Sequence, residues 1–267
     1  MPSAVRRLIP LLVLVASAGL VVAPASANHA WGNYHWARSQ FPFTVTVGDN
    51  LAPPWAPYLA RAASDWGLTD GVCNNVLNPV RVAVVPGGAK SRACKPATGR
   101  VEVCNARYGN RGWLGLAGIY VRGDHIVRAY MKLNDYYFAL PQYDSPAWRQ
   151  YVASQELGHT FGLAHQDEDF NNADLLDACG RGSCMDYSAD PANNTAPNQH
   201  DYDELATIYG GHFDAPAPAA IAVEDEFDVE DPNNWGQALR FDRGRGVVYE
   251  RALSNGGKLV TFVIWAE

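Results

Sequence analysis

The segment SQELGHTFGLAHQD, residues 154–167, concentrates side chains that are suited to metal binding and acid–base chemistry. Residues four apart share one face of a helix, so Gln155 and His159 are expected to point the same way. Glu156 is rotated from them by about 100° and can reach the same point from its side. The glycine that follows is expected to end the helix and to turn the chain back, so that His165 approaches from below. The segment therefore predicts three potential metal ligands beside one carboxylate.

The residues around this segment predict where the helix begins and ends. Ser145 is a favourable N-cap, Pro146 fits the first helical position, and Gly162 is a natural stop. Trp148 and Tyr151 extend the face that carries the metal-binding side chains, so this face is expected to look inward. A simpler interpretation is a capped helix with two hydrogen-bonded histidines. That interpretation leaves the glutamate, the glycine and the inward histidine pair unexplained together.

The string QELGHTFGLAH (155–165) resembles the metzincin metallopeptidase pattern H-E-x-x-H-x-x-G-x-x-H at every fixed position except the first. Downstream, SCMDY (183–187) resembles the Met-turn of that family, with Met185 in a tight segment. Tyr187 follows two residues later, as in astacin- and serralysin-type members. The order of predicted elements from 41 to 211 is also similar to a metzincin catalytic domain, in particular that of matrixin-like bacterial secreted proteins.

This resemblance implies a secreted zinc-dependent endopeptidase that acts on a peptide or protein substrate. His159 and His165 would be ligands of one catalytic Zn²⁺. Glu156 would be the general base that takes a proton from the water that attacks the peptide bond. Met185 would form an apolar floor beneath the metal, and Tyr187 would help to stabilise the oxyanion.

Gln155 stands where the family has its first histidine, and three interpretations are open. Gln155 could bind the metal through its amide oxygen, it could hold a water that does so, or the site could be empty in a catalytically weak or inactive extracellular binding module. The retained glutamate favours a working metal site. His200 is the best replacement for the missing ligand, although an exposed position in the first turn of a helix is the simpler expectation. His125 is expected to be exposed in a hairpin turn, and His29 and His35 lie in an aromatic N-terminal arm.

The start of the chain predicts export. Arg6 and Arg7 precede an apolar run, and APASA ends in a small-x-small pattern, so residues 1–27 are expected to be a signal peptide that is cleaved after Ala27. Without its two arginines the formal charge is 19 minus 28, or −9. An acidic exported protein is a poor candidate for binding nucleic acid or an anionic membrane. A monomer is expected.

The rest of the sequence predicts an α+β fold with a metzincin-like mixed twisted sheet, an active-site helix, a C-terminal helix and a short β tail. The domain is expected to span residues 28–211. An acidic, Pro/Ala-rich linker at 212–234 would lead to a small β-rich tail at 235–267, which packs onto the domain or forms a stub. Substrate is expected to add as a strand along the sheet edge at 125–134. The predicted elements are strands at 41–49, 79–88, 100–105, 115–123 and 125–135, and helices at 53–67, 145–162 and 200–211.

All of the cysteines lie in the exported part, where disulfides are favoured. Their spacing predicts the pairs Cys94–Cys104 and Cys179–Cys184, which leaves Cys73 unpaired. Alternatively, Cys73 displaces one of those partners, because connectivity does not follow from spacing alone.

Overall fold

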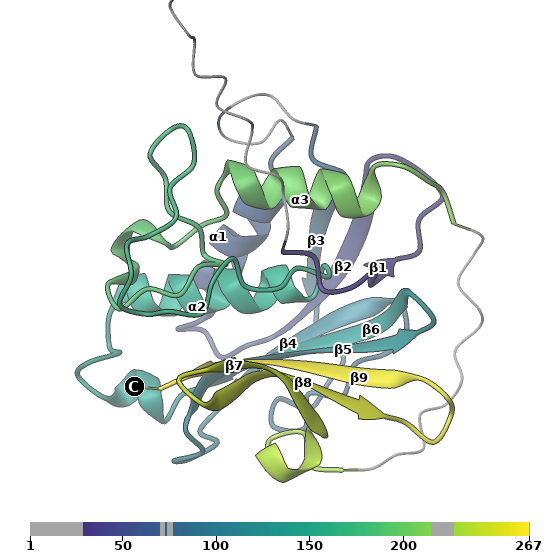
Figure 1. Cartoon of the computed structure of the whole chain (residues 1–267). Coiled ribbons are helices and arrows are strands. Elements are labelled where there is room, and N and C mark those ends of the chain that lie inside the picture. The colour runs from purple at the N-terminus through teal and green to yellow at the C-terminus, as the bar shows by residue number, and fades with distance from the viewer. Residues whose placement is uncertain (1–28, 70–72, 74–76, 215–226, 267) are drawn as a thin grey trace, which may run out of the picture.

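The computed structural model describes residues 29–69, 73, 77–214 and 227–266, so the predicted signal peptide lies outside the described residues. Over these ranges the chain forms a mixed α+β fold with one large sheet and three α-helices (Figure 1). The strands are β1 (His35–Trp36), β2 (Phe43–Asn50), β3 (Val80–Pro86), β4 (Arg100–Ala106), β5 (Trp113–Arg122), β6 (His125–Asn134), β7 (Gln237–Asp242), β8 (Arg245–Ala252) and β9 (Lys258–Trp265). The helices are α1 (Ala56–Trp66), α2 (Pro146–His159) and α3 (Gln199–Tyr209).

The sheet is mixed, and its strands follow the order β3-β2-β4-β6-β5-β9-β8-β7. The pairs among β3, β2, β4 and β6 are parallel, whereas every pair from β6 to β7 is antiparallel. The short strand β1 also pairs with β6, in parallel, at His35 and Trp36. The parallel half of the sheet is rich in β-branched residues, which suit strands that are covered on their faces.

Helices α1 and α2 pack side by side on the sheet, α1 against β3 and α2 against β5 and β6 (Figure 1). Ser145 caps α2 by accepting a hydrogen bond from the backbone N–H of Trp148 at 3.2 Å, with a proline in the first turn, as the sequence predicted. The side chain of Trp66 in α1 donates to the carbonyl of Ser154 at 2.9 Å. This contact fixes the register of the two helices, and therefore the direction in which the last turn of α2 points.

The C-terminal strands continue the main sheet. Strand β9 pairs with β5 over most of its length, from Trp113 opposite Trp265 to Val121 opposite Lys258. The sequence KLVTFVIW has an almost unbroken apolar run, and seven of its eight residues are buried. Such a run suits a strand that is covered on both faces, because an edge strand with one wet face would alternate.

This topology corrects the prediction that substrate adds along residues 125–134. Strand β6 lies between β4 and β5, so both of its edges are already paired. Its hairpin partner β5 is paired with β9 on its other side. In the described part of the chain, the edge strands of the sheet are β3 and β7. Neither of them is a neighbour of β6 in the strand order.

Part of the predicted linker also packs on the domain. Glu230 is buried, and its carboxylate lies 3.1 Å from the ammonium of Lys132 in β6. The indole of Trp235 is buried and donates to the carbonyl of Val229 at 2.8 Å. Residues 215–226 lie outside the described residues. Among the described helices, none combines the length and the apolar character that a membrane span requires.

The predicted disulfide Cys94–Cys104 is present, but the predicted pair Cys179–Cys184 is wrong. Cys179 bonds to Cys73, and Cys184 is a buried free thiol. Sequence proximity favoured the pair that does not form. Cys179 lies in an exposed loop, whereas Cys184 has already entered the core next to Met185, so the short segment between them crosses from the surface to the interior.

We expect the two disulfides to differ in their contribution to stability. The Cys73–Cys179 bond closes 106 residues and Cys94–Cys104 closes 10. On the chain-entropy model, the longer loop is worth about 2 kcal/mol more of unfolding free energy. Chemical denaturation of the Cys73→Ser/Cys179→Ser and Cys94→Ser/Cys104→Ser variants measures this difference. An equal loss in the two variants would show that loop entropy does not govern the stability of this fold.

Candidate active site

The end of α2 and the turn after it carry the two histidines of the motif. Gly162 has a φ of +94°, and a Cβ there would lie 2.2 Å from the carbonyl oxygen of Tyr34 in the N-terminal arm, so the position requires glycine. The turn brings the rings of His159 and His165 together, with centroids 4.5 Å apart and planes at 84°. The Nδ1–H of His159 donates to the carbonyl of Leu163 at 2.9 Å. That bond leaves Nε2 of the neutral ring free to act as an electron-pair donor.

Both histidines are held in their neutral form. Burial lowers the pKa of His159 well below its usual value, and the neighbouring His165 adds to the effect. Burial also lowers the pKa of His165, against the opposing influence of Glu168. Because a protonated imidazole cannot bind a metal, these environments favour the ligand form of each ring.

The Met-turn segment lies against the same histidines. Met185 is buried beneath α2, where its Sδ would lie 2.6 Å from a Cβ placed on Gly158. The ring of Tyr187 packs on His165 with centroids 4.6 Å apart. Tyr187 therefore lies beside His165, and Met185 lies against Gly158 of α2.

Glu156 lies on the side of α2 that faces β5. A Cβ on Gly115 would come within 2.6 Å of its Oε1, so the glycine in β5 makes room for the carboxyl group. Burial raises the pKa of Glu156 well above its usual range, and the nearby backbone N–H of Ile264 offsets this only in part. A carboxyl group with a raised pKa is typical of residues that exchange protons during catalysis.

Gln155 is buried on the same helix, one turn before His159. Its side-chain nitrogen donates a long hydrogen bond, 3.4 Å, to the hydroxyl of Tyr151, and Oε1 has no partner among the described residues. Both ring nitrogens of His165 are likewise buried without a hydrogen bond in the described part of the chain. Each unsatisfied buried atom of this kind costs about 1–3 kcal/mol. Amide oxygen and neutral imidazole are both ligands of divalent metals, so these residues fit a bound zinc ion.

The C-terminal strand β9 covers this site. Phe262 stacks on His159, with ring centroids 4.3 Å apart and planes at 7°. The hydroxyl of Tyr187 donates to the carbonyl of Val263 at 2.8 Å. As a result Gln155, Glu156 and His165 are 0 % exposed. The sequence did not reveal this contact, although the apolar run of β9 could have indicated a central strand.

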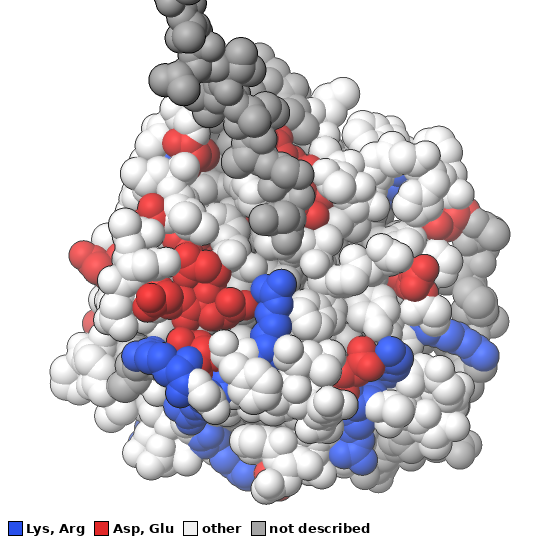
Figure 2. Space-filling model, in the orientation of Figure 1, with Lys and Arg blue, Asp and Glu red and all other residues white. Residues whose placement is uncertain are grey.

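The acidic loop after α2 is also tied to the C-terminal strands. The guanidinium of Arg240 in β7 pairs with the carboxylate of Glu168 at 3.0 Å, and that carboxylate lies 3.7 Å from Nδ1 of His165. On the face of the molecule in Figure 2, acidic side chains gather in one area and basic side chains lie next to them. The strands that cover the site are therefore held by an ion pair as well as by the sheet.

His200 does not replace the missing ligand. It lies in the first turn of α3, and its ring stacks on that of His29 with centroids 4.9 Å apart. His29 in turn lies 3.1 Å from the carboxylate of Asp201. These residues form a separate cluster beside the turn that follows α2.

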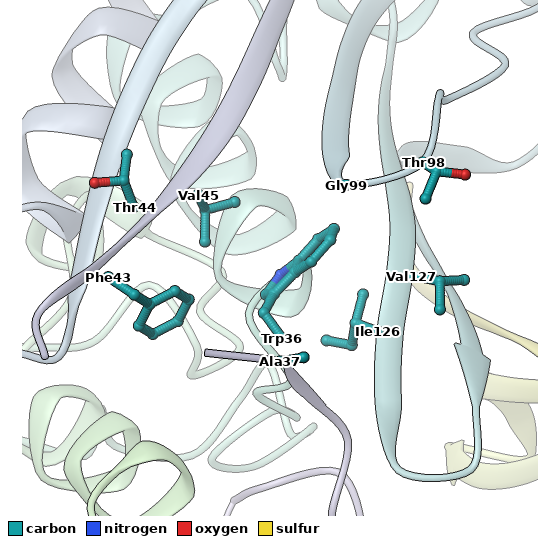
Figure 3. A pocket seen from close by; sticks show the side chains of 9 residues that line it. All are labelled: Trp36, Ala37, Phe43, Thr44, Val45, Thr98, Gly99, Ile126 and Val127. Carbon is teal, nitrogen blue, oxygen red and sulfur yellow. The ribbon is translucent and has the colours of Figure 1, made fainter. Parts of the chain in front are cut away.

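An apolar cavity of about 170 Å³ lies elsewhere, between β1, β2 and β6. Figure 3 shows Trp36 in this cavity, between Val45 and Ile126. Apart from the hydroxyls of Thr44 and Thr98, its lining side chains are apolar. It offers no side chain for proton transfer or metal binding, so the end of α2 remains the better candidate site.

The sequence matches no family model and no curated protein. Among solved structures the chain is similar to the structure of myroilysin, with a TM-score of 0.39 and 13 % identity, over 70 % of this chain and 100 % of that chain. This loose likeness is compatible with a mixed α+β fold and says nothing about the site residues.

Proposed function

We propose that the chain is a secreted, zinc-dependent endopeptidase of the metzincin type, and that strand β9 closes its cleft in the form described above. The observation that carries the proposal is the meeting of His159, His165 and Tyr187 at the end of α2, where Glu156 is buried on the same helix and the ligand atoms of Glu156 and His165 are unsatisfied among the described residues. The two disulfides are typical of exported proteins and support the proposed location.

The proposed roles follow from these positions. His159 and His165 would hold the zinc ion, with Gln155 as the third ligand through Oε1. When bound, zinc polarises a carbonyl group and makes water more acidic. Glu156 would accept the proton of the attacking water and pass it to the leaving amine. The hydroxyl of Tyr187 would donate to the carbonyl oxygen as negative charge develops on it.

Strand β9 has features of a peptide bound in such a cleft. It runs antiparallel to β5. Its Val263 carbonyl accepts a hydrogen bond from the hydroxyl of Tyr187, and we propose the same hydrogen bond for the carbonyl of a bound substrate. The backbone N–H of the next residue, Ile264, is close enough to Glu156 to lower the pKa of its carboxyl group. We therefore propose that β9 occupies the path of a substrate strand and keeps the enzyme latent.

Loosening β9 is expected to release activity. Phe262→Ala removes the ring that covers His159, and truncating a buried phenylalanine costs about 3–5 kcal/mol. Part of this loss destabilises the docked position of β9, so the fraction of molecules with β9 undocked should rise at least about tenfold. The rate at which the protein hydrolyses an unfolded protein should rise by the same factor. The assay compares the wild type with the variant at saturating zinc, with fluorescent casein as the substrate.

Val260→Ala is the matched control, because Val260 is a buried residue of β9 two positions before Phe262, whereas Phe262 supplies the ring that stacks on His159. It should give a smaller increase than Phe262→Ala. If Phe262→Ala folds, binds zinc and hydrolyses nothing, the peptidase proposal fails.

The alternative is a non-catalytic extracellular module with the same fold. The complete burial of the site and the stacking of Phe262 on His159 favour this alternative, because substrate has no path to the histidines while β9 is docked. Metal analysis at the end of α2 separates the two functions. An endopeptidase retains one zinc ion there, whereas a binding module that has lost the metal retains none.

A further inference from the structure

Four potential metal ligands lie close together at the start of β6. None of them belongs to the metzincin-like motif. His35 is in β1, His125 begins β6, and His212 and Asp214 follow α3. Strand β1 pairs with β6 at His35 and His125, and their rings lie edge to face with centroids 4.9 Å apart. The ring of His212 lies 5.0 Å from that of His35.

The ligand atoms converge on one point. Oδ1 of Asp214 lies 3.5 Å from Nε2 of His35, 3.2 Å from Nε2 of His125 and 3.4 Å from Nε2 of His212. The Nε2 atoms of His35 and His212 are 3.3 Å apart. A tetrahedral zinc ion with bonds of about 2.0–2.1 Å separates its ligand atoms by about 3.3 Å. The four measured separations are close to this value. The ligand atoms of His35, His125 and Asp214 all lie within 4.8 Å of one another, and His212 adjoins this group through His35 and Asp214.

Two of the ligands are oriented by other hydrogen bonds. Nδ1 of His35 lies 2.5 Å from the carbonyl oxygen of Asn33, which can only accept, so Nδ1 carries the proton and Nε2 of the neutral ring presents its lone pair. The second carboxylate oxygen of Asp214 accepts the backbone N–H of Arg38 at 3.1 Å, which directs Oδ1 toward the histidines. Metal-binding histidines and carboxylates are commonly held in this way.

Ion pairing alone does not account for this geometry. One carboxylate oxygen accepts at most a few hydrogen bonds, and it would have to satisfy three imidazoles at once. The close approach of two imidazole nitrogens, His35 and His212, also requires a proton or a cation between them. A divalent metal satisfies all four atoms together.

We propose that His35, His125, His212 and Asp214 form a second zinc site, which is structural rather than catalytic. His35, His125 and Asp214 would fill three ligand positions and His212 the fourth, and closed tetrahedral sites of this kind stabilise folds. The ion would join the N-terminal arm, the β5–β6 hairpin and the segment after α3. This inference does not depend on the peptidase proposal.

The test is zinc content per chain, measured by plasma mass spectrometry after exposure to zinc and removal of loosely bound metal with a weak chelator. His212→Ala is the main variant, since its side chain is 47 % exposed and its removal opens no core. We expect it to lose one zinc equivalent relative to the wild type, whether or not the α2 site also holds zinc. Asp214→Asn, which keeps the shape of the side chain, should lose the same equivalent.

Asp124→Asn is the control, because it removes an exposed carboxylate next to His125 that belongs to no group of potential metal ligands in the described part of the chain. It should retain the full zinc content of the wild type. Circular dichroism verifies that each variant is folded. The proposal is overturned if wild-type protein binds no tight zinc, if His212→Ala and Asp214→Asn bind as much as wild type, or if Asp124→Asn loses the same equivalent.

Discussion

Replacement of Gln155 by His is expected to raise the zinc affinity of the site at the end of α2 by more than about 100-fold. Even substitution of residues that only hydrogen-bond to the metal ligands alters the affinity by about 10–100-fold. Imidazole is a better zinc ligand than an amide oxygen. Gln155 lies one turn before His159 and its buried Oε1 has no partner among the described residues, so we expect the new ring to reach the same metal as His159.

The measurement is competition with a chelator in the His212→Ala background, where the second proposed zinc site is removed. Both proteins are compared at one pH, since protons compete for histidine. Gln150→His is the control on the same helix, because the Gln150 amide contacts Tyr58 and Ser154 instead of the histidines. If Gln155→His binds zinc no more tightly than its parent, residue 155 does not face the metal.

Glu156→Gln is expected to reduce peptide hydrolysis by about 10²–10⁴-fold, the usual contribution of general acid–base catalysis. The amide has the size of the carboxyl group and fits beside Gly115, but it cannot accept the proton of the attacking water. The comparison is made in the Phe262→Ala background, where β9 is loosened and turnover is measurable. Zinc content should be unchanged, since Glu156 is not a proposed ligand.

A second buried carboxylate supplies the control. Glu204 in α3 accepts the backbone N–H of His29 at 3.1 Å, a bond that an amide oxygen also accepts. Glu204→Gln should therefore leave hydrolysis within about twofold of the parent, as for most changes away from the reacting groups. Equal activity in the Glu156→Gln variant and its parent would remove Glu156 from the mechanism.

The local elements of the fold could be predicted from the sequence because their signals are local. The alternation of FPFTVTVGD predicted β2, and Ser145 with Pro146 predicted the start of α2. The pairing of β5 with β9 could not be predicted in this way, since it depends on which distant strand reaches a free edge first. For the same reason the spacing favoured Cys179–Cys184 and left the pairing of Cys73 with one of these cysteines only as the alternative, which the Cys73–Cys179 bond confirms.

The candidate site divides along the same line. His159 and His165 lie at the end of one helix and in its turn, so their spacing alone predicted that they meet. The residues that cover them or that form the second proposed metal site come from separate parts of the chain. His125 was expected to be exposed, and its neighbours His35 and Asp214 are near it only because β1 pairs with β6 and the chain returns after α3. The spacing of residues in the sequence does not predict such contacts between distant segments.

The position of β9 has a consequence for how the chain folds. Trp113 in β5 pairs with Trp265 in β9, so this half of the sheet closes only when a distant segment has docked. Contacts between distant segments form slowly, because long loops must close first. During that delay the unpaired edge of β5 is a template for strands of other chains. A truncation that removes β9 is therefore expected to aggregate.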